Sequence, residues 1–327
     1  MIGLKGMTMS HNRILWLSVL VILSPAIMPL AARAGIVAAT GQSEKTDPAG
    51  AGDEAATKAK AALKDTAAKV VLVFDSLPGE ADAKQKMLDA VAKQFDAAII
   101  YGCSAYNAIT QETVSATVGV LALGGDIQAS VALAPVEKDD FKGAGVKIGE
   151  GLKDAAVKAG QAGKLLVLIG ACHVPKDNDL TQGVLSVLGE KFPVAGGAAM
   201  GDLAYFQGKV QPMHDVGLLL SGDFKTVFSL RNSGSNDPMD QVNVARDAAK
   251  EAVGETKDKL VLLFTFECGG RRDQMGAERP KELDLIKAEA GACPIFGFYG
   301  SGEIGKKGDK PAQGVGYHIS VVAITSK

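Results

Sequence analysis

The chain has 327 residues, of which 47% are hydrophobic and 22% charged, and its formal net charge is −2 at pH 7. This composition is typical of a globular protein able to bury a core, and the length suits about two ordinary domains. The sequence contains no basic run. It therefore argues against a nucleic-acid partner, because phosphate binding needs clustered Lys and Arg.

Residues 1–34 have the features of an export signal. Positive residues, an apolar run and a small-x-small cleavage site follow in order: Lys5 and Arg13, residues 14–30, and Ala32-Arg33-Ala34. We therefore expect an exported protein, periplasmic or extracellular, whose mature chain begins at Gly35 and has no stable membrane span. An uncleaved anchor is the weaker alternative, because the apolar run is short and two prolines lie near its end.

Residues 35–52 are rich in Ala, Gly, Thr and Asp and show no apolar periodicity, so they are predicted to be a flexible leader. A second composition break, rich in Asn, Ser and Gly, lies at residues 232–238. It predicts the main domain boundary. The chain after the leader is thus divided into α/β regions at 53–235 and 236–327.

From residue 53 onwards the same series of elements is predicted three times. Each repeat begins with an Ala- and Lys-rich amphipathic helix, followed by an apolar run typical of a strand buried on both faces. These helices are expected at 53–69, 149–162 and 240–259, and the strands at 70–74, 165–169 and 260–264. A second helix follows at 81–94, 180–191 and 280–290, and a strand that begins with Val-Gly closes each repeat at 118–121, 216–219 and 315–318.

Each repeat also contains a strand that runs into a Gly-rich loop. The shared motif is Gly, four residues, Gly or Asn, one variable residue, then Ile or Leu, and it occurs at 102–109, 196–203 and 297–304. Gly and Asn reach positive φ at low cost, so each copy predicts a tight loop at a strand end. The sequence therefore predicts an α/β fold of three repeated α-β-α-β-β units that form mixed sheets with parallel crossovers. The periodicity leaves open whether they form one closed assembly or two packed domains.

Four cysteines, Cys103, Cys172, Cys268 and Cys293, lie on or beside predicted strands, and none belongs to a CxxC pair. The spacing does not indicate a zinc site, and we predict neither a metal nor a cofactor. Cys268 and Cys293 flank one β-α-β crossover, so a disulfide between them is an alternative to the favoured interpretation of buried thiols.

The richest polar segments of the chain are 266–273 and 297–305, which flank the same crossover. Glycines and an arginine at a strand end suit a carboxylate or phosphate, because backbone N–H groups and a guanidinium both bind anions. We expect Arg271 to bind a ligand carboxylate, while Gly270 allows the backbone to approach the ligand closely. Glu303 is expected to bind the ligand ammonium. Tyr299 would pack against the body of the ligand, and Cys268 would line the floor of the site. Asp202 occupies the position of Glu303 in the second repeat. The alternative is a structural Arg–Glu ion pair that closes the loops.

These two segments resemble the C-terminal half of the FIST domain, which shows Cys-x-Gly-Arg and Gly-Phe-Tyr-x-x-Gly-Glu-Ile. Here they are Cys268-Gly269-Gly270-Arg271 and residues 297–304. Phe74, the Gly102-Cys103-Ser104 loop and residues 193–202 resemble the N-terminal half, and Ser104 joins the candidate ligand residues through that loop. FIST domains are regarded as sensory modules of bacterial signalling proteins, proposed to bind small ligands such as amino acids.

The resemblance implies a FIST protein that binds a small polar ligand, with an amino acid as the expected class, and acts with a separate signalling partner. The export signal adds that this protein is an exported, stand-alone form. Two other classes stay open. One is an enzyme with Cys268 as nucleophile, whose thiolate Arg271 would stabilise but which lacks an evident His base. The other is an envelope protein that binds a partner protein. We favour the non-enzymatic binding protein.

Overall fold

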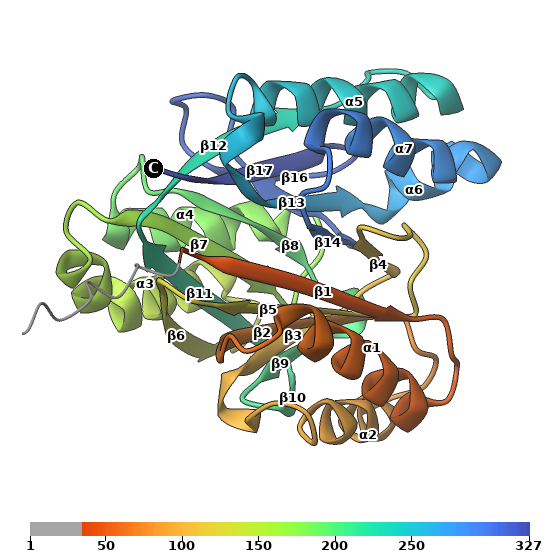
Figure 1. Cartoon of the computed structure of the whole chain (residues 1–327). Helices are drawn as coiled ribbons and strands as arrows, with labels where there is room; N and C mark the ends of the chain where they lie inside the picture. The colour runs from red at the N-terminus through yellow and green to blue at the C-terminus, as the bar shows by residue number, and fades with distance from the viewer. Residues whose placement is uncertain (1–34) are drawn as a thin grey trace, which may run out of the picture. The chain divides into compact units, whose positions relative to one another are not determined.

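Three units with the predicted order of elements are present in the computed structural model, which describes residues 35–327. Each unit consists of one predicted repeat preceded by a strand that the sequence analysis did not assign (Figure 1). The first unit contains β1 (Val37–Ser43), α1 (Pro48–Leu63), β2 (Ala68–Asp75), α2 (Ala81–Val91), β3 (Ile100–Ser104), β4 (Asn107–Thr110) and β5 (Val118–Gly124).

The second and third units follow the same plan with additional short strands. The second contains β6 (Ile127–Pro135), α3 (Phe141–Lys158), β7 (Gly163–Gly170), α4 (Lys176–Leu188), β8 (Val194–Ala198), β9 (Leu203–Phe206), β10 (Lys209–Pro212) and β11 (His214–Gly222). The third contains β12 (Phe224–Arg231), α5 (Pro238–Val253), β13 (Leu260–Cys268), α6 (Gly269–Met275), α7 (Arg279–Ala290), β14 (Ile295–Gly300), β15 (Glu303–Gly305), β16 (Gln313–Val315) and β17 (Ile319–Ser326). No helix within residues 35–327 is long and apolar enough to cross a membrane.

The expected flexible leader at 35–52 is instead part of the fold. Strand β1 pairs antiparallel with β5 over its whole length. Helix α1 begins at Pro48, within the same segment, because the Asp47 side chain accepts a hydrogen bond from the Gly50 N–H at 2.7 Å and caps it. The strand escaped prediction because its small and polar residues give a weak apolar pattern, and its pairing partner is distant in sequence.

The third closing strand was predicted to begin at Val315, but in the structure it begins at Ile319. Val315 belongs instead to β16, which forms a hairpin with β15. Tyr317 then adopts a positive φ of 59°, which a continuous strand does not allow.

The three units build mixed sheets with parallel crossovers, as predicted. Strands β2 and β3, β7 and β8, and β13 and β14 pair in parallel. The closing strands β5, β11 and β17 lie antiparallel to the first strand of each pair. The opening strands β1, β6 and β12 pair antiparallel with the closing strands of their own units.

The short strands at the ends of the Gly-rich motifs connect the units to one another. Strand β4 of the first unit pairs with β14 of the third, β9 of the second with β3 of the first, and β15 of the third with β8 of the second. Each unit thus donates one strand to another unit and receives one. This exchange closes the three units into a ring. The three units therefore form one closed assembly, which the periodicity of the sequence could not establish.

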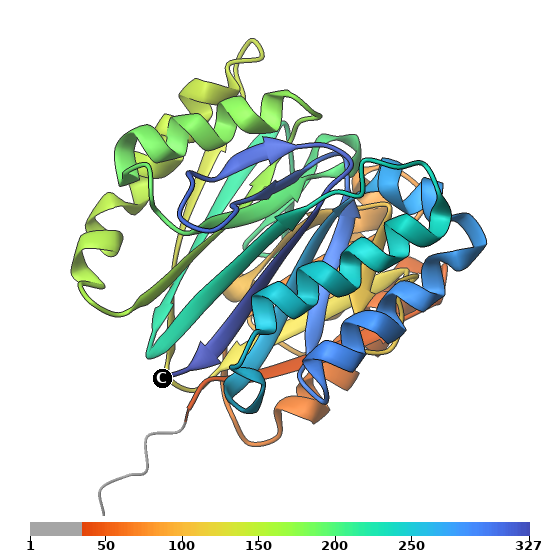
Figure 2. The same cartoon turned by 90° about the horizontal axis from the view of Figure 1, so that it is seen from above.

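A shared core lies between the inner faces of the three sheets and takes residues from every unit. At its centre the Phe74 ring packs against Phe296 and Phe298, with centroid distances of 5.0 and 4.5 Å. Helices α1 and α2, α3 and α4, and α5 with α7 cover the outer faces, each over a separate apolar cluster (Figures 1 and 2). This arrangement explains why the central strands are apolar on both faces.

The glycine that begins each motif lies where two parallel strands approach closely. A Cβ added at Gly102, Gly196 or Gly297 would lie 1.8, 1.9 or 1.6 Å from the carbonyl oxygen of Val73, Leu168 or Thr265. We expect Gly297→Ala to lower the free energy of unfolding by about 1–3 kcal/mol, because the strands must separate to admit the methyl group. Urea denaturation of the variant measures this loss.

Gly316→Ala is the matched control in the same unit, since its Cβ would meet only the Val174 side chain, at 3.3 Å or more. Its expected change is within about 0.5 kcal/mol. Equal stabilities of the two variants would contradict the requirement for glycine at the start of the motif.

Candidate functional site

The Arg271 side chain turns inward from α6 and is fully buried. Its guanidinium donates hydrogen bonds to the carboxylates of Glu267 and Glu282, and a third, of 2.5 Å, to the carbonyl oxygen of Gln241. The Tyr299 hydroxyl donates to the other oxygen of Glu282. These contacts tie α5, α6 and α7 to strands β13 and β14, and we call the four side chains Glu267, Arg271, Glu282 and Tyr299 the arginine cluster.

In the arginine cluster, burial and the neighbouring charges have opposite effects on the pKa of Arg271. Burial lowers the pKa of Arg271, but the carboxylates of Glu282 and Glu267 outweigh it, and the pKa is raised overall. Burial and the Glu282 charge raise the pKa of Glu267, and the same two causes raise that of Tyr299. The counter-ions of Arg271 are thus Glu267 and Glu282 rather than the Glu303 considered from the sequence. A direct contact of Arg271 or Tyr299 with a ligand stays a prediction.

The Glu303 carboxylate lies within hydrogen-bonding reach of the Cys268 side chain. The Glu303 carboxylate is buried and accepts a hydrogen bond from the His318 N–H. Burial raises its pKa. Burial and the Glu303 charge raise the pKa of Cys268. Cys268 is therefore a neutral thiol near pH 7, which disfavours its use as a nucleophile.

The other cysteines are equally inert. All four are free and buried, so the thiol interpretation holds in this structure and Cys268 forms no disulfide with Cys293. Burial raises the pKa of Cys103 and Cys172, and raises that of Cys293 to about 12. Within residues 35–327, no group of three or more His, Cys, Asp and Glu side chains is arranged to hold a metal ion.

Ser104 lines a cavity of about 370 Å³ at the carboxyl ends of β2 and β3. We call it the Ser104 cavity. The first unit contributes the start of α2, and the second unit contributes the loop before β9; the lining residues are Gly79, Glu80, Ala81, Lys84, Ser104, Met200, Gly201 and Leu203. Ser104 is 1% exposed. Its hydroxyl lies near that of Tyr205 and has no hydrogen-bond partner of good geometry.

Lys84 in the wall of this cavity is buried and paired. Its ammonium donates to Asp75 at 2.6 Å and to the carbonyl of Leu77, while Asp75 accepts a further bond from the Tyr205 hydroxyl. Burial raises the pKa of Asp75, and the Lys84 charge opposes that rise. Sequence reasoning missed both residues. A signal existed, because Lys84 occupies the same helix face as Met87, Leu88 and Val91, all buried.

A model of the FIST N domain matches residues 69–255, and a model of the FIST C domain matches residues 233–306. The chain belongs to the FIST family. No curated protein matches it.

Solved structures with a similar arrangement share little sequence with this FIST protein. A cyanuric acid hydrolase described as an evolutionary innovation by structural concatenation has 11% identity and a TM-score of 0.47, over 88% of this chain and 99% of its own. The cyanuric acid hydrolase of A. caulinodans has 10% identity and a TM-score of 0.46, over 89% and 100%. At this level the likeness carries no inference about activity.

The predicted site residues of the FIST protein do not form a single site in the structure but lie in several separate locations. Arg271 and Tyr299 belong to the arginine cluster, and Cys268 lies with Glu303. A Cβ at Gly270 would lie 2.7 Å from the Tyr317 ring, so that ring covers the glycine. The second-unit residue Asp202 ends a short 3₁₀ turn (Met200–Asp202) whose other two residues line the Ser104 cavity. Ser104 is the predicted residue that lines a cavity.

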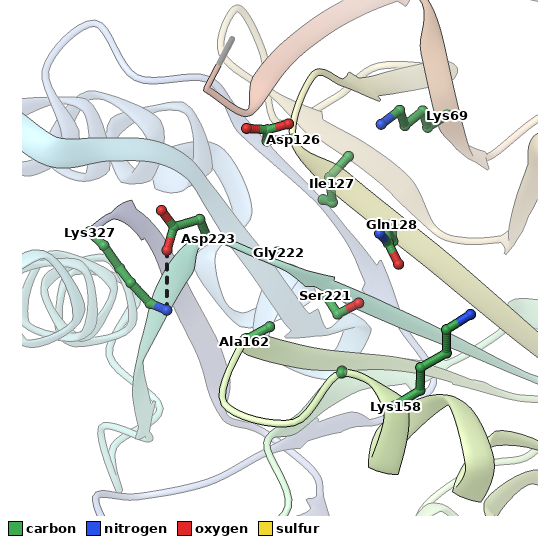
Figure 3. A pocket seen from close by; sticks show the side chains of 11 residues that line it. Lys69, Asp126, Ile127, Gln128, Lys158, Ala162, Ser221, Gly222, Asp223 and Lys327 are labelled. Carbon is green, nitrogen blue, oxygen red and sulfur yellow. Dashed lines mark ion pairs between the residues drawn. The ribbon is translucent and has the colours of Figure 1, made fainter. Parts of the chain in front are cut away.

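A second hollow of about 370 Å³ lies where β7 begins, away from the predicted residues (Figure 3). Figure 3 shows Lys69 and Lys158 among its lining residues and the ion pair between Lys327 and Asp223. The Lys327 Nζ lies 3.2 Å from the Asp223 Oδ1. The predicted site residues follow the opposite, carboxyl ends of the central strands, where open α/β sheets bind ligands. The Ser104 cavity is therefore the better candidate.

Proposed function

We propose that this FIST protein is an extracytoplasmic sensory module that binds a small, amino-acid-like ligand in the Ser104 cavity. FIST domains are known as small-ligand-binding sensory domains. The observation that carries the proposal is the buried hydroxyl of Ser104, a residue in the wall of the cavity, which has no hydrogen-bond partner of good geometry. A polar group buried in this way costs free energy unless a ligand or water satisfies it.

The chemistry of the cavity suits a carboxylate and an amine. The start of α2 lines it, and Glu80 at the N-cap makes no side-chain capping bond, so the helix presents free N–H groups and its positive dipole end. These groups and the Ser104 hydroxyl would bind the ligand carboxylate. The Glu80 carboxylate, also in the lining, would bind the ammonium. The volume of about 370 Å³ lies at the small end of the range for ligand sites.

The location and the output of the module are part of the same proposal. The export signal at residues 1–34 lies outside the described residues, and its sequence features alone support export. A ligand-induced change would be passed to a separate signalling protein. The raised pKa of Cys268 supports a binding protein over a cysteine-dependent enzyme.

Ser104→Ala tests the proposal. Screening against amino acids by thermal shift identifies a ligand, and calorimetry then compares its affinity for the variant and the wild type. We expect the variant to bind about ten- to a hundredfold more weakly, because a hydrogen bond to a charged group contributes about 1.5–3 kcal/mol. Ser326→Ala, whose hydroxyl contacts the Lys259 carbonyl at 3.4 Å, is the control and should bind normally. Unchanged affinity in Ser104→Ala would refute this site.

A further inference from the structure

A separate hollow of about 280 Å³ lies beside the segment that joins β12 to α5. Its polar lining is made mostly of amides, together with one serine and one tyrosine: Asn232, Ser235, Asn236, Gln241, Gln274 and Tyr317. No charged side chain from residues 35–327 lines it. We call it the amide pocket. A ligand with a net charge would find no counter-ion in this lining, so the lining favours a neutral partner.

The side-chain amides of Gln241, Gln274 and Asn236 form a chain of hydrogen bonds, which we call the relay. The Gln241 Nε2 donates to the Ser235 carbonyl at 2.5 Å and to the Gln274 Oε1 at 2.9 Å. The Gln274 Nε2 donates in turn to the Asn236 Oδ1 at 2.9 Å. A backbone carbonyl only accepts, so the Ser235 contact fixes which side of the Gln241 amide is the donor, and the following amides are oriented from it.

This orientation leaves one buried acceptor without a partner. The Gln241 Oε1 makes no hydrogen bond, although the residue is only 3% exposed. The main chain of the same residue is anchored, because Arg271 of the arginine cluster donates to the Gln241 carbonyl oxygen. An O–H or N–H donor on a ligand would satisfy this oxygen.

Tyr317 provides an apolar wall in an unusual conformation. Tyr317 is 54% exposed and has a φ of 59°. Its ring lies over Gly270. A bulky residue at positive φ costs free energy, and such strain often occurs at binding sites. An exposed aromatic face beside hydrogen-bonding amides matches a ligand with one apolar C–H face and a rim of hydroxyl groups.

We infer that the amide pocket is a second binding site, for a neutral sugar of about one ring. The ring face of the sugar would pack on Tyr317, and one of its hydroxyl groups would donate to the Gln241 Oε1. The remaining hydroxyl groups would exchange hydrogen bonds with the amides of the relay. This site is independent of the Ser104 cavity and of the ligand proposed there.

Saturation-transfer NMR and calorimetry with D-glucose, D-galactose and N-acetyl-D-glucosamine test this inference. Each sugar is used at about 10 mM, which reveals millimolar dissociation constants. We expect at least one sugar to bind saturably, with an affinity unchanged in high salt because no ion pair forms. Tyr317→Ala should weaken it about tenfold or more and Gln274→Leu about three- to tenfold, while Tyr317→Phe keeps the ring and should bind normally.

Two controls separate this site from the rest of the molecule. Tyr106→Ala removes the ring that covers the neighbouring Gly269 and does not line the amide pocket, so it should bind the sugar normally. Ser104→Ala should likewise leave sugar binding intact. Failure of all three sugars to bind, binding that survives in Tyr317→Ala, or binding that salt abolishes would overturn the inference.

Discussion

Replacing Arg271 by alanine is expected to lower the free energy of unfolding by about 3–5 kcal/mol. The guanidinium is fully buried, and its loss would leave the carboxylates of Glu267 and Glu282 in the core without a cation. Such a loss is a large fraction of the total stability of an ordinary domain. Urea denaturation at pH 7 measures it.

Two further variants show whether the buried charges are the cause. Arg246→Ala breaks an ion pair with Asp247 in which both side chains are partly exposed, and should change stability by less than about 1 kcal/mol. Adding Glu267→Gln and Glu282→Gln to Arg271→Met should restore part of the lost stability, because the uncompensated charges are removed. A variant that keeps its stability but loses ligand affinity would instead return Arg271 to the ligand site predicted from the sequence.

Asp215→Asn is expected to stabilise the protein above pH 7 by roughly 2–4 kcal/mol and to have little effect near pH 4. The Asp215 side chain is fully buried; its Oδ1 accepts a hydrogen bond from the Ala171 N–H at 2.7 Å, and its Oδ2 makes none. Burial raises its pKa from 3.8 to about 7. The folded protein therefore holds this proton more tightly than the unfolded chain does.

The sign of the effect follows from that difference. Below pH 3.8, where both states are protonated, the stability contribution is complete, and it is lost as the pH rises to about 7 and the buried acid ionises. Asparagine keeps the acceptor oxygen and carries no charge at any pH. Burial also raises the pKa of Asp177 to about 7, so the variant should retain part of the wild-type decline.

Denaturation profiles from pH 4 to pH 8 check this prediction. Asp223→Asn is the control, because that side chain is more than half exposed and forms a surface ion pair with Lys327. It should shift stability by less than about 1 kcal/mol at any pH. A gain in Asp215→Asn that is the same at pH 4 and pH 8 would show that ionisation of Asp215 is not its cause.

The sequence by itself determined the repeated elements of this FIST protein. Apolar runs such as 70–74 and amphipathic helices such as 81–94 were recognisable because their signals are local: periodicity, propensity and Gly-rich strand ends. The same locality explains the errors. Strand β1 lacks a strong apolar pattern and depends on pairing with β5, and the strand predicted at 315–318 is interrupted by Tyr317 in a conformation that few side chains adopt.

Only the tertiary structure decided how the units join and what the charged residues contact. Each motif predicts a tight loop, but the unit that receives β4, β9 or β15 depends on packing between sheets that are distant in sequence. For Arg271, the sequence shows a guanidinium beside two glycines and cannot distinguish a ligand carboxylate from that of a distant residue. In the fold Glu267 and Glu282 take that place, because burial of an arginine requires counter-charges within the core.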